Sequence, residues 1–396
     1  MTIGFHYHIP AIQKENGKIY IPGYLGVFLD GLTIYAEKVI CFLHSPLESE
    51  LKLLDYEIKS SNIELVDIGK HDSMMKRALV PYKYTQKIKP FLSSIDVMLI
   101  RGPSPLLPPI ASLCIKYNKK TSFLIVGDYL EGLNAAVSMN IVKKFILKVY
   151  YTYNKFLQDK YMKNSLVFVN NPKIYVEYKD KVYNCQEVKT TTLTKEDFYK
   201  RDNTCQNNII NILYTGRIDP TKGIEDMLYA VSILKKDLKV KPILHLVGWE
   251  TSLGFLDKLQ QLVIKLDLKD NFIFHGKKSV GKELFDMYKK SDIYLLASRG
   301  DFEGFPRTLW EAMAHSLPIV STPVGSIGSV LVDRYNAILS DPNCIDCLVS
   351  SIKELIIDAN LRKIIINNAY SLASTNTIEK QSQYMFEMME RYINEK

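Results

Sequence analysis

The sequence predicts an α/β protein of two doubly wound domains, each a parallel sheet with helices on both faces. Its 396 residues suffice for two domains, since a domain usually takes roughly 100–200 residues. Short apolar runs alternate with helical patterns along nearly the whole chain, which is typical of βαβ units. Most of these runs are followed within three residues by Gly, Pro, Asp or Asn. Two such domains facing each other would leave a cleft along the carboxyl edges of both sheets, where such folds bind ligands.

The first domain is expected to span residues 1–205 as a Rossmann-like unit. Its predicted strands are short runs dominated by apolar residues, as expected for strands covered on both faces. The six runs are 3–7, 39–43, 63–66, 97–100, 123–126 and 166–169.

A polar stretch at about 185–208 predicts the connection to a second Rossmann-like domain, expected at 206–375. Helical patterns at 223–236 and 255–266 separate its strand candidates. These candidates are 211–214, 243–247, 272–274, 293–296, 318–320 and 337–339. The remaining segment, 376–396, has apolar residues at helical spacing and predicts a closing amphipathic helix at 378–393.

The composition is that of an ordinary globular protein, with 47% hydrophobic and 24% charged residues. It excludes a disordered, collagen-like or disulfide-framework chain. Lys and Arg outnumber Asp and Glu by 51 to 43, and nearly all of the surplus precedes residue 187. Such a surplus attracts nucleic acid, anionic lipid or phosphorylated small molecules, and charge alone does not choose among them.

The six cysteines are scattered, and the one close pair, Cys344 and Cys347, has no second pair or nearby His to complete a zinc site. We therefore expect it to be structural or incidental. The first residues lack the pattern of a signal peptide, and the longest apolar span, near 97–115, is broken by Arg101 and four prolines. These features favour a cytoplasmic chain.

The strongest motif runs from Gly300 to Ala314, directly after the strand candidate 293–296. Pro306 suits the first position of a helix, whose free N–H groups would bind an anion or sugar hydroxyls. Glu303 lies just before this helix and Glu311 inside it. Two carboxylates at different depths of one cleft can each accept hydrogen bonds from a pair of hydroxyls, such as those of a sugar or a ribose. The alternative is that each acid only stabilises the helix.

A second motif follows the strand candidate 211–214 and opens a helix. Gly216 allows a sharp backbone turn, while Arg217 and Lys222 could converge on one anion. A planar guanidinium together with a mobile ammonium matches a diphosphate better than a carboxylate. Basic residues at such a junction can also be merely solvated.

Together these motifs closely resemble the retaining glycosyltransferases of family 4, whose GT-B fold has two facing Rossmann-like domains. The resemblance is specific over about residues 211–342 and mostly architectural before 208. It also implies that the domain at 1–205 binds the acceptor, that the domain at 206–375 binds the nucleotide sugar, and that the final helix at 376–396 crosses back onto the first domain. The matching residues are Gly216-Arg217, Lys222-Gly223, Leu246-Val-Gly248, Phe274-His-Gly276, Ser291-Asp292, and Glu303 with Glu311 as a Glu-x7-Glu pattern.

By this resemblance, Arg217 and Lys222 hold the donor diphosphate and neutralise the charge that it gains as a leaving group. Glu303, with the backbone of Gly304 and Phe305, binds sugar hydroxyls. For the nucleoside, the resemblance assigns the ribose to Glu311 and the base to the turns at Gly248 and Gly276-Lys277. The sequence has no Asp-x-Asp metal motif at a strand end, so no metal or other cofactor is expected.

The sequence also departs from this family. The segment Pro22-Gly-Tyr-Leu-Gly26 stands where a Gly-Gly pair is common, which makes Gly23 a candidate contact to phosphate. Asp128 stands where a His often closes the sugar site, and it can either orient a sugar hydroxyl or cap the next helix. The last glycine loop, 323–329, has Ser where an acid is usual. These departures affect the choice of donor.

The segment 142–163 holds six Lys and one Asp, with six apolar side chains on one helical face. Such a helix suggests docking on an anionic membrane surface, although an ordinary domain helix with solvated lysines has the same pattern. The apolar residues are Val142, Phe145, Ile146, Val149, Tyr153 and Phe156.

The expected function is retaining transfer of a hexose-type sugar from a nucleotide diphosphate donor to a glycan or lipid-linked acceptor. By analogy, this would serve bacterial surface polysaccharide or lipid-linked glycan assembly. One alternative is a GT-B enzyme that epimerises or hydrolyses the nucleotide sugar, and another is a non-catalytic scaffold of a glycan-assembly complex. Nucleic-acid binding is not expected, because the basic stretch lacks a reading motif.

Overall fold

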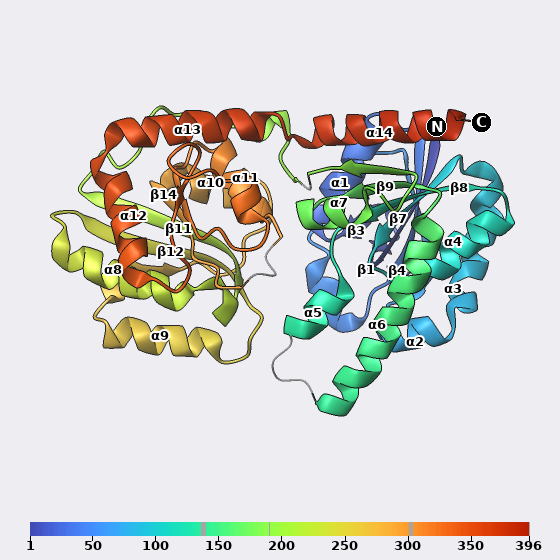
Figure 1. The fold of residues 1–396 in the computed structure, drawn as a ribbon, viewed down its shortest axis with the longest axis horizontal. Helices are drawn as coiled ribbons and strands as arrows, with labels where there is room; N and C mark the ends of the chain where they lie inside the picture. The colour runs from blue at the N-terminus through green and yellow to red at the C-terminus, as the bar shows by residue number, and fades with distance from the viewer. Residues whose placement is uncertain (136–139, 190, 301–303, 396) are drawn as a thin grey trace. The chain divides into compact units, whose positions relative to one another are not determined.

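The computed structural model describes residues 1–135, 140–189, 191–300 and 304–395 (Figure 1). Its contacts divide the chain into two compact units. The first unit consists of Met1–Thr192 and Ile378–Lys396, and the second unit is Leu193–Thr377. The chain therefore passes from one unit to the other at 192–193 and again at 377–378, whereas the sequence placed these boundaries near 205 and 375.

The first unit is built on a seven-stranded sheet with the order β10-β9-β8-β7-β1-β4-β6, and all neighbours are parallel. All six predicted strands are present, and β10 adds a seventh. The strands are β1 (Thr2–Pro10), β4 (Lys38–Ser45), β6 (Ile63–Lys70), β7 (Val97–Gly102), β8 (Lys120–Ile125), β9 (Leu166–Val169) and β10 (Asn184–Glu187). A small antiparallel sheet joins β2 (Ile12–Gln13), β3 (Ile19–Ile21) and β5 (Tyr56–Glu57).

Helices cover both faces of this sheet, because alternate side chains of each buried strand point to opposite faces. In β4, Val39 and Cys41 join the core beneath α1 (Gly23–Thr33) and α14 (Ile378–Asn394). Ile40 and Phe42 join the other core, to which four further helices contribute. These are α3 (Pro81–Ile88), α4 (Leu107–Lys116), α6 (Ile141–Met162) and α7 (Pro172–Tyr178), while α2 (Met74–Leu79) and α5 (Tyr129–Ala135) complete the unit.

The closing helix α14 is therefore part of the first unit, and it packs on α1 (Figure 1). Its approach depends on Gly31 of α1, where an added Cβ would lie 2.7 Å from Ile378 and 2.8 Å from Ser382. Ile378, Met385 and Met389 are at least 96% buried in the core.

The second unit has a six-stranded parallel sheet with the order β13-β12-β11-β14-β15-β16, and all six predicted strands are present. The strands are β11 (Ile209–Ile218), β12 (Lys241–Glu250), β13 (Phe272–Phe274), β14 (Ile293–Leu296), β15 (Ile319–Ser321) and β16 (Ile338–Leu339). The helices are α8 (Ile224–Asp237), α9 (Phe255–Lys265), α10 (Lys282–Lys290), α11 (Arg307–Ala314), α12 (Ile345–Ile357) and α13 (Ala359–Ser374).

Each sheet has one point where the direction of winding reverses. In the first unit, the chain runs from β1 outward to β6 and then returns to place β7 on the other side of β1. In the second unit, it runs from β11 to β13 and returns to place β14 on the other side of β11. Open α/β sheets bind ligands at the carboxyl ends of the strands at this switch point.

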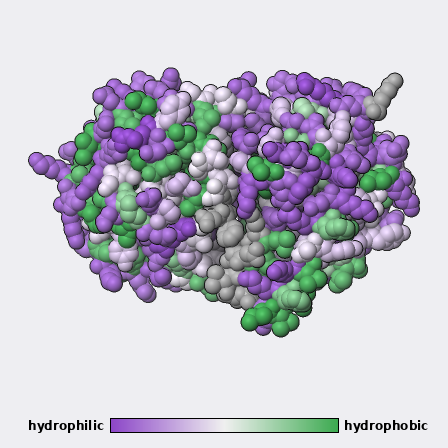
Figure 2. All heavy atoms as spheres, in the orientation of Figure 1, coloured by the Kyte–Doolittle hydropathy of each residue, from purple (hydrophilic) through white to green (hydrophobic). Residues whose placement is uncertain are grey.

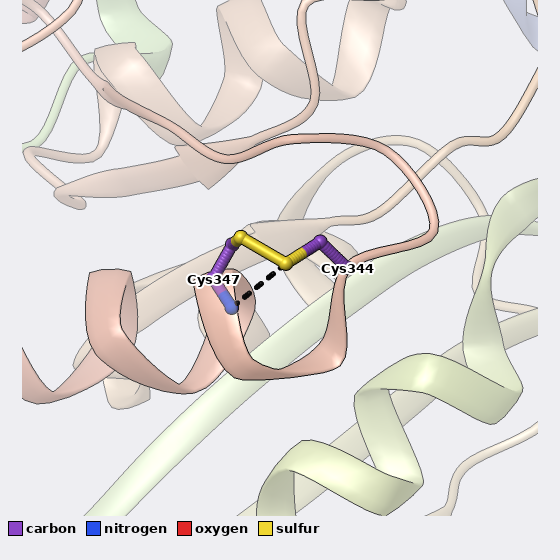
Figure 3. The surroundings of a disulfide bond; sticks show 2 residues. All are labelled: Cys344 and Cys347. Carbon is purple, nitrogen blue, oxygen red and sulfur yellow. Dashed lines mark hydrogen bonds between the residues drawn. A yellow bond between two sulfur atoms is a disulfide. The ribbon is translucent and has the colours of Figure 1, made fainter.

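The structure joins Cys344 and Cys347 by a disulfide at the start of α12 (Figure 3). The Cys347 amide also donates a hydrogen bond of 3.2 Å to the Cys344 sulfur. The sequence predicted a structural or incidental role for this pair rather than a zinc site, and the disulfide gives it a structural one. Within the described residues, no helix combines the length and apolar character needed to cross a membrane.

Candidate functional site

The first predicted cation lies where β11 leaves the sheet, beside the switch point of the second unit. The strand β11 ends with Gly216, Arg217 and Ile218, and the Arg217 side chain is exposed. Its Nε atom lies 3.9 Å from Asp219, a weak ion pair at the surface. Asp219 in turn accepts a hydrogen bond of 3.0 Å from the Thr221 amide, which starts the turn Pro220–Lys222.

Lys222 ends this turn and is 94% buried. The next residue, Gly223, begins α8 with φ of 66°. An added Cβ there would lie only 1.9 Å from the carbonyl oxygen of Ala297, just after β14. Only glycine permits this approach, which fixes Lys222 next to the end of β14.

Arg299 fixes the start of the loop that leads to the Gly300–Ala314 motif. Its guanidinium donates hydrogen bonds of 2.8 and 2.6 Å to Asp226, and its backbone amide donates to the Thr221 carbonyl at 2.8 Å. The hydrogen bonds with Asp226 raise the pKa of Arg299 above its ordinary value. Sequence reasoning missed this contact, although acids in the first turn of α8 were a visible signal.

The carboxyl ends of β11 and β12 come unusually close at two glycines. Gly216 pairs with Gly248, and an added Cβ on Gly248 would lie 1.8 Å from the Gly216 carbonyl oxygen. The Gly248 amide also donates to the carbonyl of Gly276 at 2.9 Å. Three strand ends thus expose backbone rather than side chains, which suits a flat ligand group. Beside them, the exposed Lys277 has its Nζ 5.8 Å from the centroid of the half-exposed Trp249 ring.

Glu311 is buried on α11 and receives a hydrogen bond of 2.7 Å from the Tyr288 hydroxyl of α10. That hydroxyl is also 2.6 Å from Thr215 Oγ1 in β11. Burial, followed by the charge of Glu311, raises the pKa of Tyr288 well above its ordinary value, so the phenol keeps its proton. The three residues link α11, α10 and β11. Sequence reasoning assigned no role to Tyr288 or Thr215, because they read as ordinary core residues.

The loop before α11 is described from Gly304 onward, and Glu303 lies outside the described residues. Gly304 is exposed, and the ring of the partly buried Phe305 lies 4.6 Å from the Trp310 ring. The predicted helix is present as Arg307–Ala314, with Pro306 at its cap. The segments at the switch point of the second unit, or linked to it along the chain or by hydrogen bonds, thus carry four of the predicted residues: Lys222, Gly304, Phe305 and Glu311.

Two predicted residues belong to the first unit. The Gly23 amide, at the start of α1, donates a hydrogen bond of 2.9 Å to Asp55. Asp128 accepts from the Leu130 amide at 2.7 Å, which is the helix-capping contact, and its other oxygen lies 2.5 Å from Lys155. Lys155 also lies 2.9 Å from Glu177. In this structure, the Asp128 side chain therefore caps the start of α5, which is one of the two roles that the sequence predicted for it. Among the described residues, no group of three or more His, Cys, Asp or Glu side chains could hold a metal ion.

Comparison with known proteins gives matches mainly in the second unit. Residues 195–372 match the family "Glycosyl transferases group 1". The chain is 31% identical over 241 residues to an uncharacterized glycosyltransferase of Methanocaldococcus jannaschii, a match that covers 60% of this chain and 58% of that relative. It is 25% identical over 152 residues, 38% of each chain, to the O-antigen chain mannosyltransferase B of Escherichia coli. These matches thus span only about half of the curated relatives' length, or less.

Among solved structures, Anabaena HepE in complex with UDP superimposes with a TM-score of 0.72 at 16% identity, covering 99% of this chain and 100% of that one. The predicted GT-B fold, with two Rossmann-like domains, is thereby confirmed.

Proposed function

We propose that the chain is a retaining glycosyltransferase of family 4 that transfers a hexose-type sugar from a nucleotide diphosphate donor. The observation that carries this proposal is the set of residues around the switch point of the second unit. There, the exposed Arg217 lies near the end of β11 and the buried Lys222 lies in the turn that follows this strand. Tyr288 links the carboxylate of Glu311 to Thr215 of the same strand. The family match covers the same segment, residues 195–372.

In this proposal, the anomeric C–O bond breaks and its electron pair passes to the departing diphosphate oxygen. The acceptor hydroxyl oxygen bonds to the same face of the sugar, and its proton goes to the released phosphate. Fixed positive charge beside the departing oxygens lowers the barrier, because their charge grows in the transition state. Arg217 and Lys222 supply that charge, so we propose that transfer needs no metal ion.

The remaining second-unit residues would bind the donor. We assign the sugar hydroxyls to Glu303 with the backbone of Gly304 and Phe305, and the ribose to Glu311. A carboxylate has about four sites for hydrogen bonds, so the bond from Tyr288 orients Glu311 and leaves capacity for hydroxyls. The backbone at Gly248, together with the Gly276-Lys277 turn, would contact the base. In the first unit, Gly23 as a phosphate contact and Asp128 as a contact to a sugar hydroxyl stay predictions.

The acceptor is proposed to be a glycan or a lipid-linked glycan, in bacterial surface polysaccharide assembly. The likeness to an O-antigen mannosyltransferase supports this setting. HepE is also solved with UDP-glucose, which makes a uridine diphosphate sugar the first donor to try. A panel of nucleotide sugars, screened for thermal stabilisation, would identify the donor, because a ligand that binds the folded state raises the melting temperature.

The test is sugar transfer by Arg217→Ala and Lys222→Ala. Each variant should slow transfer about tenfold to a thousandfold, because it removes a cation from the leaving group. Lys241→Ala is the matched control, because this exposed lysine starts β12 at the opposite edge of the same sheet. Folded Arg217 and Lys222 variants with control-like rates would refute the assignment. Turnover of the donor without acceptor would favour epimerisation or hydrolysis, and failure to bind any nucleotide sugar would favour a scaffold.

We also propose that α6 docks the protein on an anionic membrane surface. Its six predicted apolar side chains are 50–66% exposed, while the polar Asn154 and Gln158 are buried on the opposite side. Figure 2 shows apolar surface at the N-terminal end of this helix. An ordinary domain helix would bury its apolar face, so this exposure favours docking over the solvated-lysine alternative. Lysines beside the apolar face complement the charge of anionic lipid headgroups.

Sedimentation with vesicles that contain anionic lipid tests this docking. Replacing Lys143, Lys144 and Lys148 together by Glu should abolish most binding, because each cation near such a surface contributes about 1 kcal/mol. A matched triple replacement of Lys52, Lys116 and Lys179, which are exposed on other elements of the first unit, should bind as the unchanged protein does. Equal binding by both triple variants would refute docking.

A further inference from the structure

The switch point of the first unit gathers histidines at the carboxyl edge of its sheet. His6 and His8 lie toward the end of β1, His44 lies near the end of β4, and His71 directly follows β6. The His44 ring lies 5.5 Å from the ring of His71 and 6.3 Å from that of His6. His71 Nε2 lies 2.7 Å from the His8 carbonyl oxygen. Four of the seven histidines of the chain thus form one cluster.

Two buried arginines border this cluster. Arg77 of α2 is 4% exposed, and one of its terminal nitrogens donates a hydrogen bond of 3.3 Å to the His8 carbonyl. Arg101 of β7 is 9% exposed, and its guanidinium carbon lies 4.8 Å from the centroid of the Tyr7 ring. The positive charges of both arginines lower the pKa of His8, so both act at the same place.

In the described part of the chain, no carboxylate forms an ion pair with either guanidinium, and the Nε atoms of both make no hydrogen bond. The nearest acid, Glu50, has its carboxylate 2.6 Å from His71 Nδ1, and its charge acts on Arg77 without an ion pair. The buried Nδ1 of His8 and Nε2 of His44 also make no hydrogen bond.

A buried charge without an opposite charge is unfavourable. For Arg101, the rings of Tyr7, Tyr24 and Phe28, whose centroids lie 4.8, 5.7 and 6.0 Å from its guanidinium carbon, offset only part of this cost.

The histidines do not relieve this imbalance. Burial lowers the pKa of His6 to about 4 and that of His8 to about 3, so both rings are neutral at pH 7. Neutral imidazoles can still donate one hydrogen bond each. Tyr7, His8 and Tyr129 are each partly exposed, so solvent reaches the cluster at this edge.

We propose that Arg77, Arg101 and His8 form a binding site for a phosphoryl group, made of other residues than the diphosphate site proposed in the second unit. Donors come from α2, β1 and β7, so they approach from different directions. A tetrahedral phosphate offers oxygens in several directions, whereas a carboxylate offers two in one plane, so phosphate fits the set better. The site lies at the sheet position where folds of this kind bind ligands.

The role of this site rests on the proposed function: it would hold a phosphate of the acceptor. That phosphate belongs either to a free sugar phosphate or to a lipid-linked acceptor. The site adjoins α6, because the charge of Arg77 acts on the Tyr150 hydroxyl and the Tyr151 ring stacks on Tyr129 at 4.8 Å. The helix that reaches the phosphate site therefore also carries the apolar face proposed to meet lipid.

The experiment measures binding to the full-length protein by calorimetry, with the donor site already saturated by the nucleoside diphosphate found in the panel. The probes are a sugar 1-phosphate and a polyisoprenyl phosphate in detergent micelles, with empty micelles as the blank. Arg77→Gln and Arg101→Gln should each weaken binding at least tenfold. Arg391→Gln, at an exposed position of α14 in the same unit, is the matched control and should bind normally.

Binding of both probes assigns the site to the phosphate they share, and binding of one alone identifies the source. No binding of either probe to a protein that binds its nucleotide overturns the phosphate site and leaves the proposed function standing. Equal binding by all variants overturns it as well. Nucleotide affinity is measured in each variant, so a failure of the donor site is seen separately.

A structural role for the arginines predicts a different result in a second variant. Arg101→Met removes the charge and keeps an apolar side chain against Tyr7. If the arginine serves a ligand, the melting temperature without ligand should stay the same or rise, because a buried unpaired charge is removed, and stabilisation by the sugar 1-phosphate should disappear. A lower melting temperature with unchanged stabilisation by this probe would contradict the proposal.

Discussion

Replacing Tyr288 by Phe tests whether Glu311 is held in place for a ribose. The substitution deletes one hydroxyl from a fully buried ring and removes its 2.7 Å hydrogen bond to the Glu311 carboxylate. The Tyr288 side chain is fully buried, so bulk water does not take the place of its hydroxyl. A hydrogen bond to a charged group contributes about 1.5–3 kcal/mol, which corresponds to roughly tenfold to 150-fold in affinity.

The assay compares two ligands by calorimetry: the nucleoside diphosphate that stabilises the protein most, and inorganic pyrophosphate, which lacks a ribose. Tyr288→Phe should weaken the nucleotide about tenfold to 150-fold and leave pyrophosphate nearly unchanged, because Arg217 and Lys222 are intact. Tyr229→Phe, on the more exposed Tyr229 of α8, is the control and should change neither affinity. Equal losses for both ligands, or no loss for the nucleotide, would refute the assignment of Glu311 to the ribose.

Three further predictions concern stability. In urea unfolding, Gly223→Ala should destabilise the protein by at least about 2 kcal/mol more than Gly254→Ala does. Both glycines have positive φ, but only a Cβ at Gly223 would clash, with the Ala297 carbonyl oxygen. Similar losses for the two variants would mean that the loop at Ala297 moves to accommodate the added Cβ. The pKa of His6 is about 4 in the folded protein and 6.5 in the unfolded chain. The free energy of unfolding should therefore fall by roughly 3 kcal/mol because of His6 as the pH drops from 6.5 to 4, and it should then level off. His6→Asn should flatten this slope, and an unchanged slope would exclude His6 as the cause. Arg299→Lys should lower the free energy of unfolding, measured in urea, by about 1 kcal/mol, because an ammonium cannot make both hydrogen bonds to Asp226. Arg334→Lys, at an exposed ion pair, should lower it less, and equal losses would contradict a special role of Arg299.

The sequence predicted the parts of the candidate site that follow from local pattern. Gly216, Arg217 and Lys222 come shortly after the predicted strand 211–214, so their place at the carboxyl edge follows from the direction of parallel strands. The start of α11 was predicted within one residue because Pro306 fixes it. These inferences need only the order of residues along one βα unit.

Contacts between distant elements were not predictable in the same way. Tyr288 has the helical spacing of a core residue, and nothing local tells that its hydroxyl meets Glu311. Arg77 and Arg101 are 24 positions apart in the sequence and belong to different elements, α2 and β7, so only the assembled sheet brings them to His8. The apolar face of α6 was read correctly from its spacing, but its exposure depends on what the fold leaves uncovered.

The place of α14 has a consequence for the order in which the protein can form during translation. The ribosome releases Met1–Thr192 first, but the core of that unit lacks Ile378, Met385 and Met389 until the intervening Leu193–Thr377 has been made. Until then, α1 lacks the helix that packs beside Gly31. The second unit, in contrast, contains its entire core and can fold as soon as it emerges. The core on one face of the first sheet is thus completed only by the last helix of the chain, although most of this unit is synthesised first.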